Sequence, residues 1–344
     1  MTTMTAFEKD IAEQPAALIR LANSTLPDLS GVAATAFDRI IFTGMGTSDY
    51  ASIGSWRRLV ALGRPAWTVD TGQLLENLSL VTSRTLLIVT SQSGSSGETL
   101  ALLDYFSSSK VRPAVTVGIT DSASSPLAQV ADVFLPLLSG HEATVSTKSY
   151  LNTLAIHRSL SAAFTGESRD VVNQEILATA ENIESLIGGI DFTGLAEAAV
   201  AHPRRRLAYV GRGDEAATAK FAALITKESS KVPAEGFVGG QFRHGPFELA
   251  GQGLTVILFG LTSNKRDESL ERLSRDLVAT GTSVVIVGNY EMEGATTVQV
   301  DGDSGLEKLS ASTVVAELLA VALARANGVV PGEFLFGNKI TKAL

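Results

Sequence analysis

The chain has 344 residues, of which 45% are hydrophobic and 19% charged, a composition typical of a folded protein with more than one domain. Its formal net charge of −8 argues against a nucleic-acid partner, because phosphate backbones attract basic surfaces. It contains no cysteine, which excludes disulfides, thiolate metal sites and a cysteine nucleophile.

The chain starts with MTTMTAFEKDIAEQP, which lacks the basic start and apolar run of a signal peptide. We therefore expect a cytoplasmic protein, with a leading helical segment over residues 1–35. The most apolar long stretch is Ser310–Asn327, and it contains Glu317 near its middle and Arg325 near its end. These charges favour a buried helix over a membrane span, so no membrane partner is expected.

Short apolar runs rich in Val, Ile and Leu alternate with helical segments along the chain. This alternation predicts parallel sheets that are covered by helices on both faces. The predicted strands are Arg39–Thr43, Thr85–Thr90, Val115–Ile119, Val133–Leu137, Leu207–Val210, Leu254–Phe259 and Ser283–Val287. The predicted helices include Asp49–Leu62, Gly97–Ser107, Leu151–Ala163, Glu215–Ser230, Asp267–Thr280 and Ser310–Ala326.

The order of these features repeats in the two halves of the chain. The segment Arg39–Gly46 (RIIFTGMG) matches Arg206–Gly213 (RLAYVGRG), and the next two strands follow at nearly the same offsets. A repeat of this length predicts an α/β protein with two doubly wound domains in tandem. Gly-Gly and Phe-Thr-Gly near Gly188–Leu195 suggest the join. The predicted domains are therefore 36–187 and 188–330, followed by a tail over 331–344.

Three polar segments follow strands in the first half, where ligands of open parallel sheets bind. The first is Gly44-Met45-Gly46-Thr47-Ser48. It resembles part of a dinucleotide fingerprint, but the third glycine is absent. Two other interpretations remain open for it, a ligand-binding loop and a plain tight turn that caps a helix.

The second segment, Ser91-Gln92-Ser93-Gly94-Ser95-Ser96, precedes a predicted helix. Hydroxyl groups and helix N–H groups together can bind a phosphate without any cationic side chain. The alternative is a serine-rich turn with an N-cap. The density of hydroxyl groups favours a phosphate site, and we therefore expect a small phosphorylated ligand.

The third segment, Glu142–Ser149, lies after a predicted strand and before a predicted helix. Its hydroxyl groups could close over a sugar, although a plain capped loop fits the same spacing. In the second half, Glu228 lies near the end of a predicted helix and His244 lies in a loop before Gly245-Pro246. Glu and His are the common proton-transfer groups at neutral pH. Each could also be an ordinary solvated or packed side chain.

Taken together, these segments resemble the sugar isomerase (SIS) domain family, over essentially the whole chain and in the family's order. The resemblance is to the isomerase half of glucosamine-6-phosphate synthase and to related phosphosugar deglycases and deaminases. The matching pieces are Glu8–Pro15, Gly46-Thr47-Ser48, Ser91-Gln92-Ser93-Gly94, Ser146-Thr147-Lys148, Lys227-Glu228, Ala234-Glu235, His244-Gly245-Pro246 and a C-terminal tail containing Lys339.

The resemblance implies two flavodoxin-like SIS domains and a set of residue roles. Glu228 would move a proton between C1 and C2 of an open-chain sugar, His244 would assist ring opening across a homodimer interface, and Lys339 would close over the sugar. The residues implied to hold the phosphate are Ser48, Ser91, Gln92, Ser93 and Ser96. Further substrate contacts are expected from Gly46, Thr47, Thr144, Val145 and Ser146.

Two departures from the synthase pattern affect the expected activity. Ile225 stands where the synthase has a lysine three residues before the base glutamate, and no cysteine is present for a glutaminase. We therefore expect a phosphosugar isomerase, or an aminosugar-phosphate deaminase or deglycase, rather than a glucosamine synthase. No metal or organic cofactor is expected. The competing hypothesis is a phosphosugar-binding sensor without catalysis, which would keep the serine loop but would not need Glu228.

Overall fold

The computed structural model describes residues 4–263 and 267–342. Residues 1–3 of the predicted leading segment and 343–344 of the predicted tail lie outside the described residues. The chain forms two compact units, each built on its own sheet. Within the described residues, the N-terminal unit contains 16–142, 148–177 and 336–342. The C-terminal unit contains 4–15, 143–147 and 178–335, apart from 264–266.

The N-terminal unit has a parallel five-stranded sheet in the order β2-β1-β3-β4-β5. Its strands are β1 (Arg39–Thr43), β2 (Ala66–Thr68), β3 (Thr85–Thr90), β4 (Val115–Thr120) and β5 (Val133–Pro136). All six residues of the central strand β3 are buried, as expected for a strand that is covered on both faces. The strand order is that of flavodoxin-like folds, which confirms the predicted fold class for this unit.

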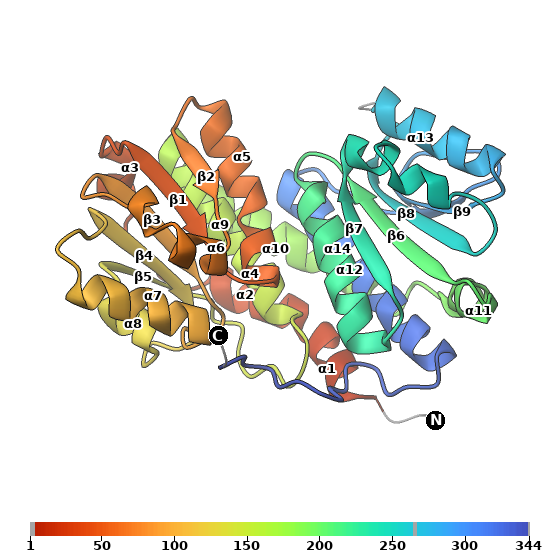
Figure 1. The fold of residues 1–344 in the computed structure, drawn as a ribbon, viewed down its shortest axis with the longest axis horizontal. Coiled ribbons are helices and arrows are strands. Elements are labelled where there is room, and N and C mark those ends of the chain that lie inside the picture. The colour runs from red at the N-terminus through yellow and green to blue at the C-terminus, as the bar shows by residue number, and fades with distance from the viewer. Residues whose placement is uncertain (1–3, 264–266, 343–344) are drawn as a thin grey trace. The chain divides into compact units, whose positions relative to one another are not determined.

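Helices cover both faces of this sheet (Figure 1). The helices that begin before or within this unit are α2 (Gln14–Ala22), α3 (Ser30–Ala34), α4 (Thr47–Ala51), α5 (Ile53–Ala61), α6 (Thr71–Glu76), η1 (Leu78–Leu80), α7 (Gly97–Ser108), α8 (Pro126–Val130), α9 (Lys148–Thr165) and α10 (Arg169–Leu186). Helix α7 contacts both α6 and α8, while α3, α4 and α5 pack on α9. The carboxyl ends of the strands are thereby left for the loops.

The C-terminal unit repeats this arrangement with the strand order β10-β9-β8-β6-β7. Its strands are β6 (Arg206–Gly211), β7 (Ala234–Val238), β8 (Leu254–Leu261), β9 (Ser283–Gly288) and β10 (Thr296–Gln299). Successive residues of β6 pack into the hydrophobic clusters on opposite faces of the sheet. Leu207 and Tyr209 belong to one cluster, and Ala208 and Val210 belong to the other. This alternation follows from the two-residue period of a strand and confirms the predicted second sheet.

The helices of the C-terminal unit include one long apolar helix. They are α1 (Ala6–Ala12), α11 (Thr193–Ala201), α12 (Glu215–Ser230), α13 (Glu268–Ala279) and α14 (Gly305–Ala326), with 3-10 turns η2 (Gly239–Arg243) and η3 (Pro246–Leu249). Helix α14 is long and apolar enough to cross a membrane, but 78% of its most apolar window is buried. The prediction of a buried helix in this segment is therefore confirmed.

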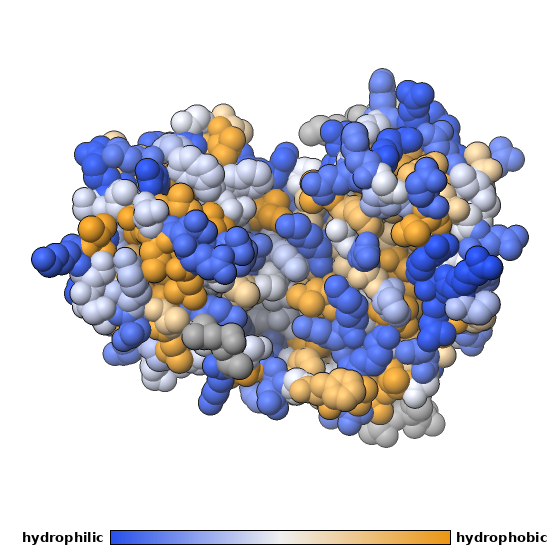
Figure 2. All heavy atoms as spheres, in the orientation of Figure 1, coloured by the Kyte–Doolittle hydropathy of each residue, from blue (hydrophilic) through white to orange (hydrophobic). Residues whose placement is uncertain are grey.

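Helix α13 has the opposite character and is strongly amphipathic. Leu270, Leu273 and Leu277 are buried against the sheet, whereas Arg272 and Arg275 are exposed. Figure 2 shows hydrophilic residues gathered over this helix. The face of the sheet beneath α13 is thus closed by an apolar stripe of ordinary helical spacing.

Most predicted elements are found, with some differences in their limits. The predicted helix Asp49–Leu62 is interrupted at Ser52, and the predicted helix Leu151–Ala163 starts earlier, at Lys148. The strands β2, β7 and β10 and the helices α6, α8, α10 and α11 were not among the predicted elements. They add edge strands and connections without changing the predicted topology.

Candidate functional site

The serine-rich segment forms a tight loop at the carboxyl end of β3. The N–H of Ser91 donates to the carbonyl of Ile119 at 3.0 Å, and the N–H of Gly94 donates to the carbonyl of Ser91 at 3.0 Å. The hydroxyl of Thr120 donates to the carbonyl of Gln92 at 3.1 Å. These bonds tie the loop to the neighbouring strand β4, so its hydroxyl groups are held by the backbone of the sheet.

Gly94 is required by the shape of this loop. Its φ is +61°, a region that favours glycine. A Cβ atom at this position would lie 2.7 Å from the Cβ and in still closer contact with the Oγ of Ser125, and 2.8 Å from the Oγ1 of Thr120. The loop therefore packs directly on the segment that follows β4.

The loop leads into the N-terminus of α7, a helix of 12 residues. Ser96 is the N-cap residue, and within the described chain its side chain makes no capping bond to the helix backbone. Its hydroxyl lies 2.8 Å from that of Thr99 instead. The first-turn N–H groups carry the positive end of the helix dipole and are suited to bind an anion. The N–H of Gly97 donates to the carbonyl of Thr341 in the tail at 3.1 Å.

The loop after β1 lies beside the serine-rich loop, because β1 and β3 are hydrogen-bonded neighbours. A Cβ atom at Gly44 would lie 2.9 Å from the carbonyl oxygen of Thr90, so the two strand ends are in close contact. Gly46, Thr47 and Ser48 follow at this edge and are partly exposed. The structure therefore brings the predicted Ser48 and the predicted serine-rich loop to adjacent strand ends of one unit.

A buried histidine supports the serine-rich loop from inside the unit. His157 is 2% exposed, and its Nε2 lies 3.2 Å from the Oγ1 of Thr90, the residue before Ser91. Burial lowers the pKa of His157 to about 3, so the ring is neutral at physiological pH. Sequence reasoning did not identify this residue, because a histidine within a helix carries no signal of what it contacts.

Glu142, at the start of the third predicted segment, is buried in the N-terminal unit. Its carboxylate accepts bonds from the N–H of Ser149 at 3.0 Å and from the Oγ of Ser149 at 2.6 Å. The Nζ of Lys339 lies 2.7 Å from its Oε2. These partners hold the pKa of Glu142 below its usual value against the opposing effect of burial. Lys339, the predicted tail lysine, is therefore paired with a buried carboxylate.

The middle of the third segment belongs to the C-terminal unit. Thr144 and Ser146 are partly buried there, and Val145 is buried. A Cβ atom at Gly332, where the tail begins, would lie 3.0 Å from the Oγ1 of Thr144. The predicted substrate contacts of this segment thus lie next to the start of the tail.

Glu228 lies near the carboxyl end of α12 and is partly buried. Its backbone carbonyl accepts a bond from the Nζ of Lys231, which also donates to the carbonyl of Glu333 in the tail. The N–H of Gly332 donates to the carbonyl of Ser229 at 3.3 Å. The predicted base thus lies at a helix end that is fixed by the first residues of the tail.

His244 lies between the 3-10 turns η2 and η3 and is exposed. Its neighbour Arg243 donates to the carboxylate of Asp276 on α13 at 2.7 Å, which anchors the turn. An exposed imidazole on an anchored turn is available to a ligand or to a second protein chain.

Glu215, at the start of α12, is a second titratable group that sequence reasoning missed. Its Oε1 accepts a bond from the Oγ of Ser312 at 3.0 Å, and its Oε2 is buried. Burial raises the pKa of Glu215 to about 7, and hydrogen bonds from Thr218 and Ser312 oppose this only in part. In the repeat that aligns Arg39–Gly46 with Arg206–Gly213, Glu215 corresponds to Ser48. The loop after β6 thus carries a carboxylic acid where the loop after β1 carries a serine.

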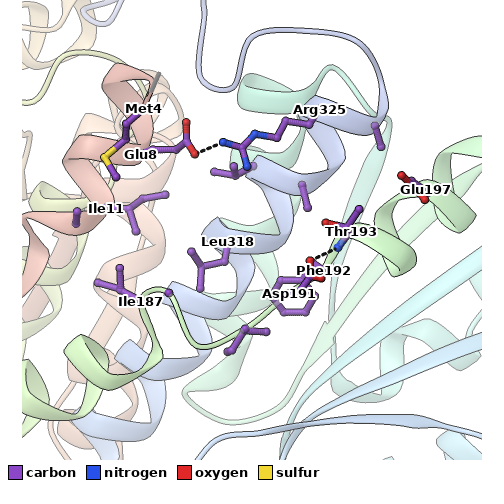
Figure 3. Close-up of a pocket in the computed structure, with 16 residues that line it drawn as sticks. Met4, Glu8, Ile11, Ile187, Asp191, Phe192, Thr193, Glu197, Leu318 and Arg325 are labelled. Carbon is purple, nitrogen blue, oxygen red and sulfur yellow. Dashed lines mark hydrogen bonds and ion pairs between the residues drawn. The ribbon is translucent and has the colours of Figure 1, made fainter. Parts of the chain in front are cut away.

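The C-terminal unit also contains a cavity of about 400 Å³ between α1, α11 and α14. Figure 3 shows Ile11 and Leu318 at its walls and the ion pair of Glu8 with Arg325, whose closest atoms lie 2.5 Å apart. None of the predicted site residues is among the residues that line it. We therefore assign the candidate site to the loops and helix ends and not to this cavity.

Comparison with known proteins gives a consistent family match. A model of the SIS domain matches residues 36–165 and 201–294. The isomerizing glutamine–fructose-6-phosphate aminotransferase of Pyrococcus horikoshii is 29% identical over 289 residues, which cover 82% of this chain and 48% of that protein. The chain therefore spans about half the length of this curated relative.

Two solved structures are similar in fold over nearly the whole chain. The C-terminal domain of glucosamine-fructose-6-phosphate aminotransferase from Francisella tularensis has a TM-score of 0.83 at 18% identity and covers 96% of this chain and 99% of that chain. The glucosamine-6-phosphate deaminase of Thermotoga maritima has a TM-score of 0.74 at 21% identity and covers 98% of this chain and 100% of that chain. At these identities the likeness establishes the fold.

Proposed function

Because the chain belongs to the SIS domain family, we propose that it is an enzyme that isomerises or deaminates a 6-phosphosugar, with an amino sugar or a sugar–amine adduct as the substrate class. One observation carries this proposal: the serine-rich loop after β3 runs directly into an α-helix whose N-cap side chain makes no capping bond within the described chain. The names of the relatives, isomerizing aminotransferase and deaminase, point to the same substrates.

The phosphate would be held by Ser91, Gln92, Ser93 and Ser96, with Ser48 contributing from the adjacent strand end. Hydroxyl groups and the α7 N-terminus supply donors to the phosphate oxygens, which suits an acidic protein that has no need of a basic patch. Gly46, Thr47, Thr144, Val145 and Ser146 would contact the sugar, and Lys339 would close over it. No metal or organic cofactor is required by this chemistry.

Glu228 would act as the general base on the open-chain sugar. On an aldose, its carboxylate would take the proton from C2 and return it to C1, and on a ketose adduct with an amine at C1 it would move the proton in the reverse direction. The electron pair of the broken C–H bond forms the C1–C2 double bond of an enediol or enolamine while the carbonyl oxygen takes a proton from water, and that double bond then supplies the pair for the new C–H bond. For an amino sugar the product is an imine at C2, which water hydrolyses to a ketose phosphate and ammonia. A positioned general base contributes roughly 10²–10⁴-fold to the rate.

His244 would assist ring opening, and we propose that it does so in the site of a second subunit. Its exposure on an anchored turn supports this assignment. The protein would then be a cytoplasmic homodimer whose sites are shared. Each subunit would consist of the leading segment 1–35, a phosphosugar-binding domain over 36–187, an acid–base domain over 188–330 and the tail 331–344.

The test is a panel of sugar phosphates in D₂O, including fructose 6-phosphate, glucosamine 6-phosphate and fructosamine 6-phosphate. We expect one of them to be converted with deuterium incorporated at C1 or C2. Glu228→Gln should abolish both turnover and deuterium incorporation while leaving the affinity for the sugar phosphate within about threefold, because the amide cannot accept a proton. Glu184→Gln, on the exposed face of α10, is the matched control and should retain full activity.

Two outcomes would count against this function. If Glu228→Gln turns over a confirmed substrate at the normal rate, Glu228 is not the base. If sugar phosphates bind to the serine-rich loop but none reacts, the protein is a phosphosugar sensor and not an enzyme.

A further inference from the structure

The ion pair of Glu142 with Lys339 joins two segments that are 197 residues apart in the chain. The side chain of Glu142 is fully buried, and that of Lys339 is 22% exposed. Among the described residues from 335 to 342, Lys339 is the one that is only partly exposed. The others, which include Leu335, Phe336 and Ile340, are exposed at the surface. The lysine is therefore the point at which the tail enters the unit.

A second contact fixes the direction of the tail two residues later. The carbonyl of Thr341 accepts a bond from the N–H of Gly97 at 3.1 Å. Gly97 is the first residue of α7, directly after the serine-rich loop. Residues 339–341 thus run from the Glu142 carboxylate to the helix N-terminus of the proposed phosphate site, entirely within the N-terminal unit.

The carboxylate of Glu142 is itself held rigidly. Ser149, in the first turn of α9, donates to it through both its N–H and its hydroxyl, at 3.0 and 2.6 Å. Charge-assisted bonds of this kind are shorter and stronger than neutral ones. A carboxylate fixed in this way defines one position for the ammonium group that neutralises it.

We propose that Glu142 is a positioning residue, which holds the ammonium group of Lys339 at the edge of the serine-rich loop before the substrate arrives. This inference rests on the proposed function, in which Lys339 closes over the sugar. The buried charge of Glu142 makes the tail position specific, because a buried carboxylate that has lost its cation is strongly destabilising. The tail would then already be ordered when the phosphosugar binds, so binding would not carry the entropy cost of ordering a free chain end.

The decisive variant is Glu142→Gln, which keeps the shape of the side chain and an acceptor for Ser149 but removes the charge. Hydrogen–deuterium exchange of the peptide over 335–342 should accelerate about tenfold. On the substrate identified in the panel, kcat should fall about 10–100-fold, while the Kd for inorganic phosphate changes by less than about threefold, because the serine-rich loop is intact. Glu76→Gln, on the exposed surface of α6 in the same unit, is the control and should change none of these.

Lys339→Met and the double variant Glu142→Gln/Lys339→Met complete the experiment. If the two residues act as one unit, the double variant should lose no more activity than Lys339→Met alone. The double variant removes both charges of this pair, so it replaces Glu142→Gln should that variant not fold. Glu142→Asp, which retains the charge, should restore slow exchange of the tail at least in part.

The proposal is overturned by either of two results. One is a tail that exchanges in Glu142→Gln as slowly as in the unmodified protein. The other is a released tail with unchanged kcat, which would make Glu142 an anchor without a role in the reaction. If the unmodified protein turns over no phosphosugar, the proposed function fails separately, and the exchange data alone decide whether Glu142 fixes Lys339.

Discussion

The Nε2 of His157, on helix α9, lies 3.2 Å from the Oγ1 of Thr90, the last residue of strand β3. The ring also packs against Phe42 of the neighbouring strand, with ring centroids 5.8 Å apart. The serine-rich loop starts at the next residue, Ser91. The strand end from which the loop leaves the sheet is therefore held in place by the buried side chain of His157. This contact links the stability of the unit to the protonation state of one imidazole.

His157 should make the protein sensitive to acid. Its pKa is lowered to about 3 by burial, below the value of about 6.5 for an unfolded chain. Its contribution to stability is therefore complete above pH 6.5 and is lost as the pH falls toward 3. His157→Gln should reduce the fall in the free energy of unfolding between pH 7 and pH 5 by about 2 kcal/mol, as measured by urea denaturation.

The control for this prediction is His141→Gln, because His141 is exposed. It should leave the pH dependence as it is in the unmodified protein. An unchanged slope in His157→Gln would show that the ring is not held neutral in the folded state.

Glu215 should have the opposite pH dependence. Burial raises its pKa to about 7, above the unfolded value, so its contribution to stability is complete below about pH 4.5 and is lost as the pH rises through 7. Glu215→Gln should therefore increase the free energy of unfolding at pH 8 by about 2 kcal/mol relative to its effect at pH 5. Urea denaturation at the two pH values measures this, with the exposed Glu268→Gln as the control. Equal effects at both pH values would contradict the raised pKa.

The sequence predicts the central strands well because both of their faces are buried. Every residue of Thr85–Thr90 is buried, and burial on both faces is what a continuous apolar run in a sequence indicates. The edge strands that the sequence does not predict are different: β2 has three residues, of which one is buried, and β7 contains Glu235 and Gly236. Such segments become strands through pairing with a neighbour, which their own composition does not indicate.

The features of the candidate site also differ in whether the sequence predicts them. The serine-rich loop is visible in the sequence because its residues are contiguous and precede a helix. The pairing of Glu142 with Lys339, the burial of the Glu215 carboxylate oxygen and the contact of His157 with Thr90 all depend on long-range packing. A single sequence contains no signal for those contacts. Lys339 and the segment that begins at Glu142 are predicted from the sequence, but their pairing is visible only in the fold.

Gly94→Ala tests whether the loop geometry is needed for phosphate binding. The added Cβ would meet Ser125 and Thr120, and the φ of +61° is unfavourable for alanine. We expect a loss of about 2–4 kcal/mol in the free energy of unfolding and at least about tenfold weaker binding of inorganic phosphate by calorimetry. Gly166→Ala, with φ +72° and nothing within 4 Å of its added Cβ, is the control for backbone strain alone. It should cost about 1 kcal/mol and leave phosphate binding unchanged.

If the active sites are shared between subunits, mixing two inactive variants should restore activity, which would not occur in a monomeric enzyme. If His244 of one subunit serves Glu228 of the other, a mixed dimer of His244→Ala and Glu228→Gln has one site with both changes and one site with neither. Random mixing gives about half mixed dimers, so activity should return to about a quarter of that of the unmodified enzyme. Each variant alone should stay inactive on ring-closed substrate. The measurement is turnover after unfolding and refolding the two variants together, with sedimentation to confirm the dimer. A mixture as inactive as its components, in a sample shown to contain mixed dimers, would place Glu228 and His244 of the same subunit in one site.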